Sequence, residues 1–352
     1  MFYGCNVSCN QLPTSSNGDW SALIQRFSPH SYSIIYKRKE EGRFLPDFRS
    51  RLEVGVSSPK MMNVLDILRK ALDDIGDRTA IIQCQSVSGG DINYAYYVRR
   101  KHRSYFVKVN KKIPPRFFKS EAAGLELLRK TNTVKVPNVY YVMEEESGAY
   151  GLLLLEWIEG EKTEQTAVLL GQAVAQLHQC YGQHFGWAED NYIGRLPQKN
   201  GLYENWMDYF VKCRLLPQIQ LAEQKGRMPT ARRNKLEKLL VSLERWLPQQ
   251  CRPSLLHGDL WGGNWIVGAK GMPYLIDPSV FYGHYEFEIA FTELFGGFPD
   301  QFYEAYKEIQ PLSPEYEERK ELYQLFYLLV HLNLFGETYG YSVDRILQKY
   351  VG

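Results

Sequence analysis

One stretch of the sequence decides the fold. It reads HGDLWGGN at residues 257–264 and is followed thirteen residues later by Asp277. Between them, residues 265–267 and 274–276 are short runs of branched and aromatic side chains, separated by a turn that contains glycine. This pattern predicts a two-stranded hairpin. A hairpin returns the chain alongside itself, so Asn264 and Asp277, at its two feet, should lie close together.

Three side chains of this stretch predict a specific chemistry. An amide oxygen from Asn264 and a carboxylate from Asp277 are hard ligands that suit Mg²⁺, which proteins often bind together with substrate phosphates. Asp259 precedes Asn264 by five residues, the spacing of a catalytic loop whose aspartate accepts the proton of an attacking hydroxyl. HGD alone also fits a turn aspartate held by backbone amides, but the three residues together favour phosphoryl transfer.

A second group of residues lies upstream. Lys108 falls in an alternating apolar run, and Glu121 falls in the helical pattern that follows it. In phosphoryl transfer, a strand lysine that touches nucleotide phosphates is held by a glutamate of the neighbouring helix. A lone lysine in a strand more often faces solvent, so the downstream motif carries much of this prediction. Gly89 and Gly90 form a turn whose backbone N–H groups could cover phosphates, although a plain hairpin turn is an alternative.

The apolar run that ends at Glu156, Trp157 and Ile158 is predicted to lie where two lobes join. Backbone groups exposed there could hydrogen-bond an adenine ring, and apolar side chains could enclose it. Because backbone atoms would make these contacts, the side chains themselves carry little information.

Candidate substrate residues come from three places. Aromatic and amide side chains gather between residues 185 and 200, including Asp190 and Asn191; they suit sugar recognition, and a structural loop is the alternative. Trp261, inside the catalytic loop, is better placed to stack on a substrate. His331 lies on the apolar face of a helix, where a histidine either belongs to the core or contacts substrate.

The composition excludes several classes of protein. The 352 residues carry a formal net charge of +2, which argues against a nucleic-acid groove because such a groove needs clustered basic residues. The longest apolar run, at 325–335, is too short to span a membrane. The N-terminus does not resemble a secretory signal, and the six cysteines show no CxxC spacing. We therefore expect a soluble cytoplasmic protein with reduced thiols that binds neither nucleic acid nor membranes.

The periodicity of the sequence changes along the chain. Residues 1–60 show no sustained pattern and are predicted to be an N-terminal extension, disordered or outside the native start. Residues 61–158 predict a nucleotide-binding lobe built from a small antiparallel sheet, and residues 159–352 predict a larger helical lobe for catalysis and substrate. The fold class is therefore α+β with two lobes. The predicted helices lie at 64–72, 117–129, 166–179, 203–224, 232–246, 287–295 and 322–335.

From about Met62 to the C-terminus, the sequence resembles the fructosamine kinase family, the ketosamine 3-kinases, whose fold resembles protein kinases and aminoglycoside phosphotransferases. The motifs that carry this resemblance are SGGDIN at 88–93, FVKVN at 106–110, FGW at 185–187, LHGDLWGGN at 256–264, FYGHYEFE at 281–288 and LFGGF at 294–298. General small-molecule kinases share the HGD, Asn and Asp core, but they lack the motifs at 281–288 and 294–298.

The resemblance implies roles for these residues. Asp259 is then the catalytic base, Asn264 and Asp277 hold Mg²⁺, and Lys108 with Glu121 serves the phosphates of ATP. The implied activity is phosphorylation of the 3-hydroxyl of a ketosamine, either ribulosamine or fructosamine, free or on a glycated protein, and hence deglycation repair. Two alternatives stay open from the residues alone: a kinase for an aminoglycoside, choline or a sugar, and an inactive kinase-like binding module.

Overall fold

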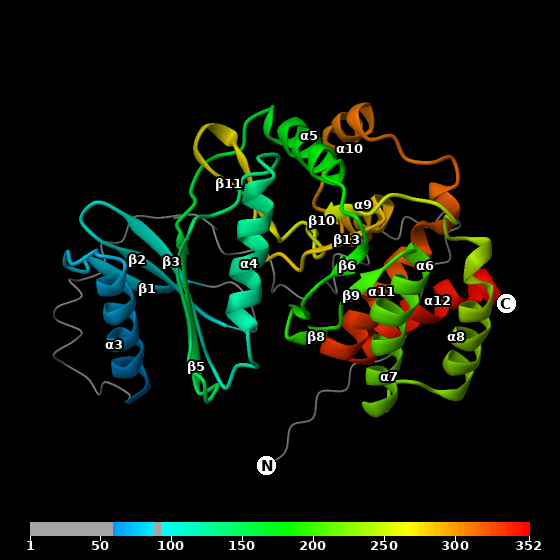
Figure 1. The fold of residues 1–352 in the computed structure, drawn as a ribbon, viewed down its shortest axis with the longest axis horizontal. Helices are drawn as coiled ribbons and strands as arrows, with labels where there is room; N and C mark the ends of the chain where they lie inside the picture. The colour runs from blue at the N-terminus through cyan, green and yellow to red at the C-terminus, as the bar shows by residue number, and fades with distance from the viewer. Residues whose placement is uncertain (1–58, 88–92) are drawn as a thin grey trace, which may run out of the picture.

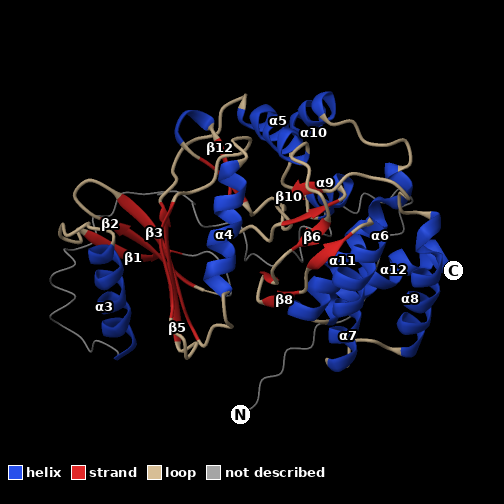
Figure 2. Ribbon diagram, viewed as in Figure 1, coloured by secondary structure: helices blue, strands red, loops and turns tan. Residues whose placement is uncertain are grey.

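The computed structural model describes residues 59–87 and 93–352. They form a five-stranded sheet lobe and a larger lobe that is mostly helical (Figures 1 and 2). The predicted two-lobed α+β fold is confirmed. Gly89, Gly90 and the predicted N-terminal extension, except its last two residues, lie outside the described residues. The boundary between lobes at residues 158 and 159 stays a prediction.

The sheet of the smaller lobe is antiparallel throughout, in the order β1-β2-β3-β5-β4. Two helices cover its opposite faces (Figure 1). One of them begins at Pro59 rather than near Asn63, as proline suits the first turn of a helix. The elements are α3 (Pro59–Asp74), β1 (Gln83–Val87), β2 (Tyr94–Arg99), β3 (Ser104–Lys111), α4 (Phe117–Lys130), β4 (Val139–Glu144) and β5 (Tyr150–Glu156).

The two faces of β3 meet different partners. Tyr105, Val107 and Val109 pack in the apolar cluster under α3, whereas Phe106 packs in the cluster that contains α4. Successive side chains of a strand point to opposite sides of the sheet, so Lys108 shares the face of Phe106. Lys108 is only 5% exposed. The alternative that this lysine faces solvent is therefore wrong.

The core of the larger lobe forms around two helices, α9 (Tyr285–Leu294) and α11 (Tyr316–Phe335), which pack against each other. Most side chains of both helices are buried. The remaining helical elements of this lobe are α5 (Thr166–His178), α6 (Trp206–Tyr209), the π-helix η1 (Phe210–Leu215), α7 (Leu216–Gln224), α8 (Thr230–Ser242), η2 (Leu243–Arg245), η3 (Ala269–Gly271), α10 (Asp300–Ile309), η4 (Glu337–Tyr339) and α12 (Gly340–Val351).

Short strands position the loops of the larger lobe. The predicted hairpin is present as β11 and β12, and below it the backbone N–H of Ile276 donates to the carbonyl of Asn264 at 3.0 Å. A four-stranded sheet in the order β10-β13-β6-β9 and a second hairpin, β7 with β8, were not predicted. These strands are β6 (Phe185–Trp187), β7 (Asn191–Ile193), β8 (Leu196–Gln198), β9 (Gly201–Tyr203), β10 (Ser254–Leu256), β11 (Trp265–Val267), β12 (Pro273–Leu275) and β13 (Phe281–Gly283).

The helix predicted at 203–224 is confirmed from Trp206 to Gln224, but its predicted start is too early. Residue 203 belongs to β9, which pairs with β6. The helix starts at Trp206, where the side chain of Asn205 accepts the N–H of Asp208 and caps it. Its middle is the π-helix η1, just before Pro217 near the start of α7. Proline has no N–H to donate to a preceding turn of α-helix, and here the helix continues through the π segment.

The lobes touch at α4 and at the linker. The hydroxyl of Tyr192 donates to the carbonyl of Pro115 just before α4, at 2.9 Å, and the N–H of Leu275 in β12 donates to the carbonyl of Lys135 after α4, at 2.8 Å. The linker is the segment that follows β5 and joins the two lobes. A Cβ added to Gly160 in this linker would lie 1.9 Å from the carbonyl oxygen of Gly268, so the backbone at Gly160 packs directly against the turn of the β11–β12 hairpin.

Candidate active site

The catalytic loop is held from behind by a buried carboxylate. Glu288 of α9 accepts the backbone N–H groups of His257 and Gly258 at 3.0 and 2.6 Å, and the Nε2–H of His178 at 2.9 Å. Burial alone would raise the pKa of Glu288, but the bond from His178 and the nearby donors lower it. The hydroxyl of Tyr327 donates to the carbonyl of Gly258 at 3.1 Å. We did not predict that Glu288 and Tyr327 hold the loop.

The loop conformation needs its glycine and its histidine. Gly258 has φ +86°, and an added Cβ would lie 2.0 Å from the carbonyl of Ser279, so another residue would be strained and would clash. The side chain of His257 bonds the carbonyl of Ile276 through Nε2 at 2.8 Å, while its Nδ1 accepts the N–H of Asp259 at 3.3 Å. Burial lowers the pKa of His257, which keeps this neutral tautomer.

Asp259 and Asn264 lie side by side. The Nδ2 of Asn264 donates to the backbone carbonyl of Asp259 at 2.8 Å and to its Oδ2 at 3.1 Å. The amide oxygen of Asn264 is then the atom left to act as a ligand. Burial, and next the charge of Asp277, raise the pKa of Asp259 well above its usual range. A carboxylate with a raised pKa is a stronger base, which suits proton transfer at neutral pH.

Lys108 joins the two lobes electrostatically. Its Nζ lies 2.7 Å from Oε1 of Glu121 in α4 and 2.6 Å from Oδ1 of Asp277 at the hairpin foot. Burial would lower the pKa of Lys108, but the two carboxylates outweigh it and raise the pKa. Asp277 has φ +57°, which is uncommon for a residue other than glycine and typical of functional sites.

The donor set fits Mg²⁺. Within residues 59–87 and 93–352, no three His, Cys, Asp or Glu side chains gather into a metal site. The protein would therefore supply one amide oxygen from Asn264 and one carboxylate oxygen from Asp277. Mg²⁺ commonly takes one or two side-chain ligands and completes its shell with phosphate oxygens and water.

The predicted adenine residues lie at the end of β5 beside the linker. The carboxylate of Glu156 accepts the backbone N–H and the Nδ2 of Asn138 at 3.1 and 2.7 Å. The backbone N–H of Trp157 donates to the carbonyl of Ser104 at 3.4 Å, and Ile158 is buried. Their contact with a nucleotide stays a prediction.

Asp190 and Asn191 have partners within the protein. Asp190 accepts the backbone N–H of Asn200 at 2.8 Å. Asn191 is buried, donates to the carbonyl of Val280 at 2.9 Å, and accepts from the side chain of Gln198 at 2.9 Å. These bonds support the structural-loop alternative, and a contact with substrate stays a prediction for both residues.

Trp261 lies inside the catalytic loop, and His331 lies one turn of α11 after Tyr327, which bonds that loop. The Nδ1–H of His331 donates to the carbonyl of Tyr327 at 2.8 Å, and burial lowers the pKa of His331 to about 4. The ring is therefore neutral with an acceptor at Nε2, and the rings of Phe295 and Tyr339 lie beside it at 4.7 and 5.1 Å between centroids. Trp261 is partly exposed. Both substrate assignments stay predictions.

This geometry combines a loop aspartate, a hairpin with an amide and a carboxylate at its feet, and a lysine–glutamate pair from the other lobe. Among protein families, the model described as "Fructosamine kinase" matches residues 64–352. The chain belongs to the fructosamine kinase family. The predicted family and the predicted class of enzyme, a phosphotransferase with an alcohol acceptor, are thereby confirmed.

Relatives of this family member cover most of its length. "Probable ketoamine kinase HMPREF0351_12196" of Enterococcus faecium is 44% identical over 268 residues, which covers 75% of this chain and 94% of the relative. "Protein-ribulosamine 3-kinase, chloroplastic" of Oryza sativa subsp. japonica is 32% identical over 336 residues, covering 94% of this chain and 97% of the relative.

Solved structures agree on the fold. "Putative fructosamine-3-kinase" from Haemophilus somnus 129PT superposes with a TM-score of 0.72 at 29% identity, covering 81% of this chain and 97% of that one. A mutant of the aminoglycoside phosphotransferase APH(4)-Ia, solved with AMP-PNP and hygromycin B, superposes with a TM-score of 0.55 at 18% identity, covering 81% and 99%. The chain therefore has the fold of ATP-using kinases.

Proposed function

We propose that the chain transfers the γ-phosphoryl group of ATP to the 3-hydroxyl of a ketosamine, with Mg²⁺ as the metal. Membership of the fructosamine kinase family supports this substrate class. The observation that carries the proposal is the ion pair between Lys108 and Asp277 at 2.6 Å, beside Asp259. It supports the proposal because residues of both lobes meet there that would serve as a phosphate-binding cation, a metal ligand and a base.

Each residue has a distinct part in the reaction. Asp259 orients the substrate hydroxyl and accepts its proton. Lys108, held by Glu121, offsets charge on the phosphates of the nucleotide. Asn264 and Asp277 would hold Mg²⁺, which when bound neutralises charge on the phosphates. Because phosphoryl transfer needs little covalent help from a protein, positioning and electrostatics supply most of the acceleration.

The product explains a repair role. A phosphate beta to an enolisable carbon leaves readily as inorganic phosphate, and water then hydrolyses the resulting imine, which detaches the sugar and regenerates the amine. The acceptor is a small ketosamine or one carried by a glycated protein. The neutral Nε2 of His331 can accept a hydrogen bond from a sugar hydroxyl, and the ring of Trp261 offers a face for stacking.

An acceptor panel tests this proposal. ATP consumption is measured with a ribulosamine, a fructosamine, an aminoglycoside, choline and a free sugar. The two ketosamines should be phosphorylated at the 3-hydroxyl, and turnover should fall by about 10²-fold or more in Asp259→Asn. The control is Asp300→Asn, an exposed position at the start of α10, which should keep full activity. Preference for a non-ketosamine acceptor would reject the substrate class, and near-normal turnover of Asp259→Asn would reject the base.

The proposed compartment is the cytoplasm. None of the helices in the described part of the chain combines the length and the apolar character that a membrane crossing requires. The rice relative, however, carries "chloroplastic" in its name. Fractionation of native cells followed by immunoblotting tests the proposal, and recovery of the protein in an organelle fraction would overturn it.

A further inference from the structure

A cavity lies in the helical lobe, beside the start of β10 and the start of α9. Its volume is about 360 Å³, and its lining includes Ser254, His284, Arg319 and Arg252. This volume falls in the range of sites for small molecules. Ser254 opens β10, whereas the catalytic loop follows the other end of the same strand. None of the residues assigned to catalysis lines this cavity.

Ser254 supplies an unsatisfied polar group in this lining. The residue is wholly buried, and its Oγ has no hydrogen-bond partner among the described residues. A buried hydroxyl is normally paired, because leaving it unpaired forfeits the bonds that water would make. A molecule in the cavity would supply the missing partner.

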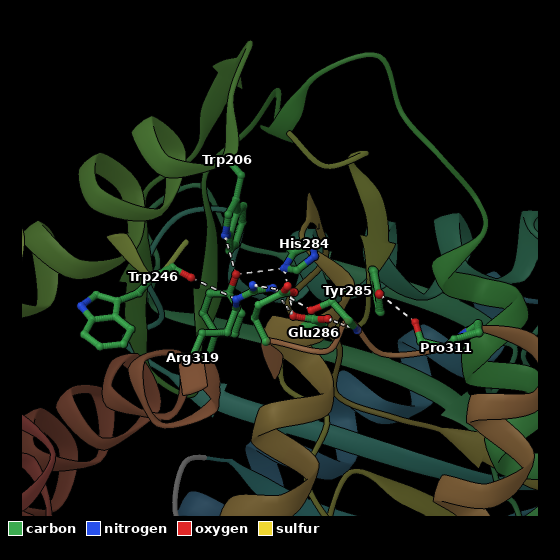
Figure 3. A network of polar contacts seen from close by, with 10 residues as sticks. Trp206, Trp246, His284, Tyr285, Glu286, Pro311 and Arg319 are labelled. Atoms are coloured by element: carbon green, nitrogen blue, oxygen red, sulfur yellow. Dashed lines mark hydrogen bonds and ion pairs between the residues drawn. The ribbon is translucent and has the colours of Figure 1, made fainter. Parts of the chain in front are cut away.

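A chain of hydrogen bonds fixes the proton on His284. The Nε1–H of Trp206 donates to the hydroxyl oxygen of Tyr323 at 3.1 Å, and the same hydroxyl is hydrogen-bonded to Nδ1 of His284 at 2.9 Å (Figure 3). Oε2 of Glu286 lies 3.9 Å from Nδ1, beyond hydrogen-bond distance. Burial lowers the pKa of His284 to about 3, so the ring is neutral. We assign its proton to Nε2, the tautomer in which the Tyr323 hydroxyl donates to Nδ1. Nε2 lies on the side of the ring away from the network (Figure 3).

Two of the three guanidinium nitrogens of Arg319, Nε and Nη1, are hydrogen-bonded within the protein. Its Nη1 donates to Glu286 at 2.9 Å and to the hydroxyl of Ser313 at 3.0 Å, and its Nε donates to the carbonyl of Trp246 at 3.0 Å (Figure 3). For Nη2, the structure gives only an ion pair with Glu315 at 3.6 Å, which is longer than a hydrogen bond. The side chain of Glu315 is 59% exposed, so solvent competes for it.

Arg252 adds a second guanidinium group. Its Cζ lies 3.4 Å from the centre of the ring of Tyr181, which also lines the cavity. Stacking on an aromatic face holds an arginine in place without using its N–H groups. No carboxylate of residues 59–87 or 93–352 forms an ion pair with Arg252.

These groups share one property, which is that all of them can donate hydrogen bonds. We propose that the cavity binds a small molecule through an oxyanion group, a carboxylate or a phosphate, which accepts from Ser254, from Nε2 of His284 and from the two arginines. Guanidinium groups match the geometry of such oxyanions. Two carboxylates lie near these groups: Glu286, which is paired with Arg319, and Glu315, which lines the cavity 3.6 Å from the same guanidinium. Among the described residues, Arg252 is therefore the cation of this lining that no carboxylate neutralises. This proposal does not depend on the ketosamine reaction.

Titration of the full chain tests the site. Inorganic phosphate, succinate and sorbitol are added separately, without nucleotide or Mg²⁺, and binding is followed by calorimetry and by the thermal unfolding midpoint. We expect saturable binding of phosphate, of succinate or of both, and none of sorbitol. Ser254→Ala and Arg252→Ala should each weaken anion binding about tenfold or more, as expected when a bond to a charged group is lost.

Matched controls separate binding from folding. Ser242→Ala and Arg233→Ala, both in α8, should leave anion binding unchanged. Without ligand, Ser254→Ala should unfold at the same temperature as the unsubstituted protein or higher, because it removes an unpaired buried hydroxyl. Binding of phosphate alone or succinate alone tells which oxyanion the site takes. Three results would overturn the proposal. The first is the absence of saturable anion binding, and the second is equal binding of sorbitol. The third is anion binding that neither variant weakens, which is the result expected for phosphate held in the catalytic cleft.

Discussion

Glu288→Gln tests how the catalytic loop is positioned. The carboxylate accepts two backbone N–H groups, at 3.0 and 2.6 Å, and one from His178 at 2.9 Å. Glutamine replaces one acceptor oxygen with an NH₂ group, which then faces a donor. One charge-assisted bond is lost and one buried N–H is left unpaired, which should lower the free energy of unfolding by about 2–4 kcal/mol. Displacement of Asp259 by about 1 Å would lower kcat about 10²-fold.

Two measurements separate these effects. Urea unfolding gives the loss of stability, and steady-state kinetics with a ketosamine give kcat and KM for ATP. The matched control is Glu293→Gln, on the same helix, which loses bonds to Tyr316 and Lys320. It should lose some stability but keep kcat. A Glu288→Gln enzyme with normal kcat, or an equal loss of kcat in the control, would refute this role of Glu288.

Three further predictions follow from the described contacts. Chelation of Mg²⁺ should abolish turnover, and Asp277→Asn should raise the Mg²⁺ concentration needed for half-maximal rate; an unchanged requirement would contradict the ligand assignment. Because burial lowers the pKa of His331 from 6.5 to about 4, the unfolded chain binds its proton first, so the free energy of unfolding should fall as pH drops from 6.5 towards 4. In urea unfolding at several pH values, His331→Gln should flatten that part of the plot of unfolding free energy against pH. An unaltered slope would contradict the assignment of this pH dependence to His331. Gly160→Ala, whose Cβ would meet the carbonyl of Gly268 at 1.9 Å, should lower both the melting temperature and kcat/KM for ATP; wild-type values would show that the linker can shift at no cost.

Local sequence rules predicted the parts of the fold that depend on near neighbours. The hairpin after Asn264 follows from its turn and its short strands, and this places Asn264 near Asp277. Strand alternation puts Lys108 on the same face as Phe106 and opposite Val109. Alternation alone did not predict that Lys108 is buried, and that part of the prediction came from the motif at 257–277.

Long-range bonds could not be predicted in this way. The contact of Glu288 with His257 spans 31 residues, and that of Tyr327 with Gly258 spans 69. The signal that could have indicated Glu288 was the presence of two glutamates, Glu286 and Glu288, among the apolar residues at the start of α9. Periodicity treats such a residue as solvent-facing, and only the packing of three segments shows that it is buried and paired.

The start of the predicted helix at 203–224 was placed too early for a related reason. Its apolar residues fit a helical period, but β9 gains partners in β6 that lie more than ten residues away. Tertiary pairing therefore overrode the local preference. The loop around Asn191 shows the same limit, because its amide is used by Val280 and Gln198, and composition alone cannot reveal such partners.

The attachment of α4 to the larger lobe has a consequence for control of the enzyme in the cell. Bonds from Tyr192 to Pro115 and from Leu275 to Lys135 fix the chain on both sides of this helix, and the ion pair between Lys108 and Glu121 is already formed. In this structure, contacts within the chain alone hold the helix where the ion pair forms. If the same holds in the cell, the rate of the proposed repair would be governed by how much of the protein is made and degraded, and by how fast damaged amines accumulate.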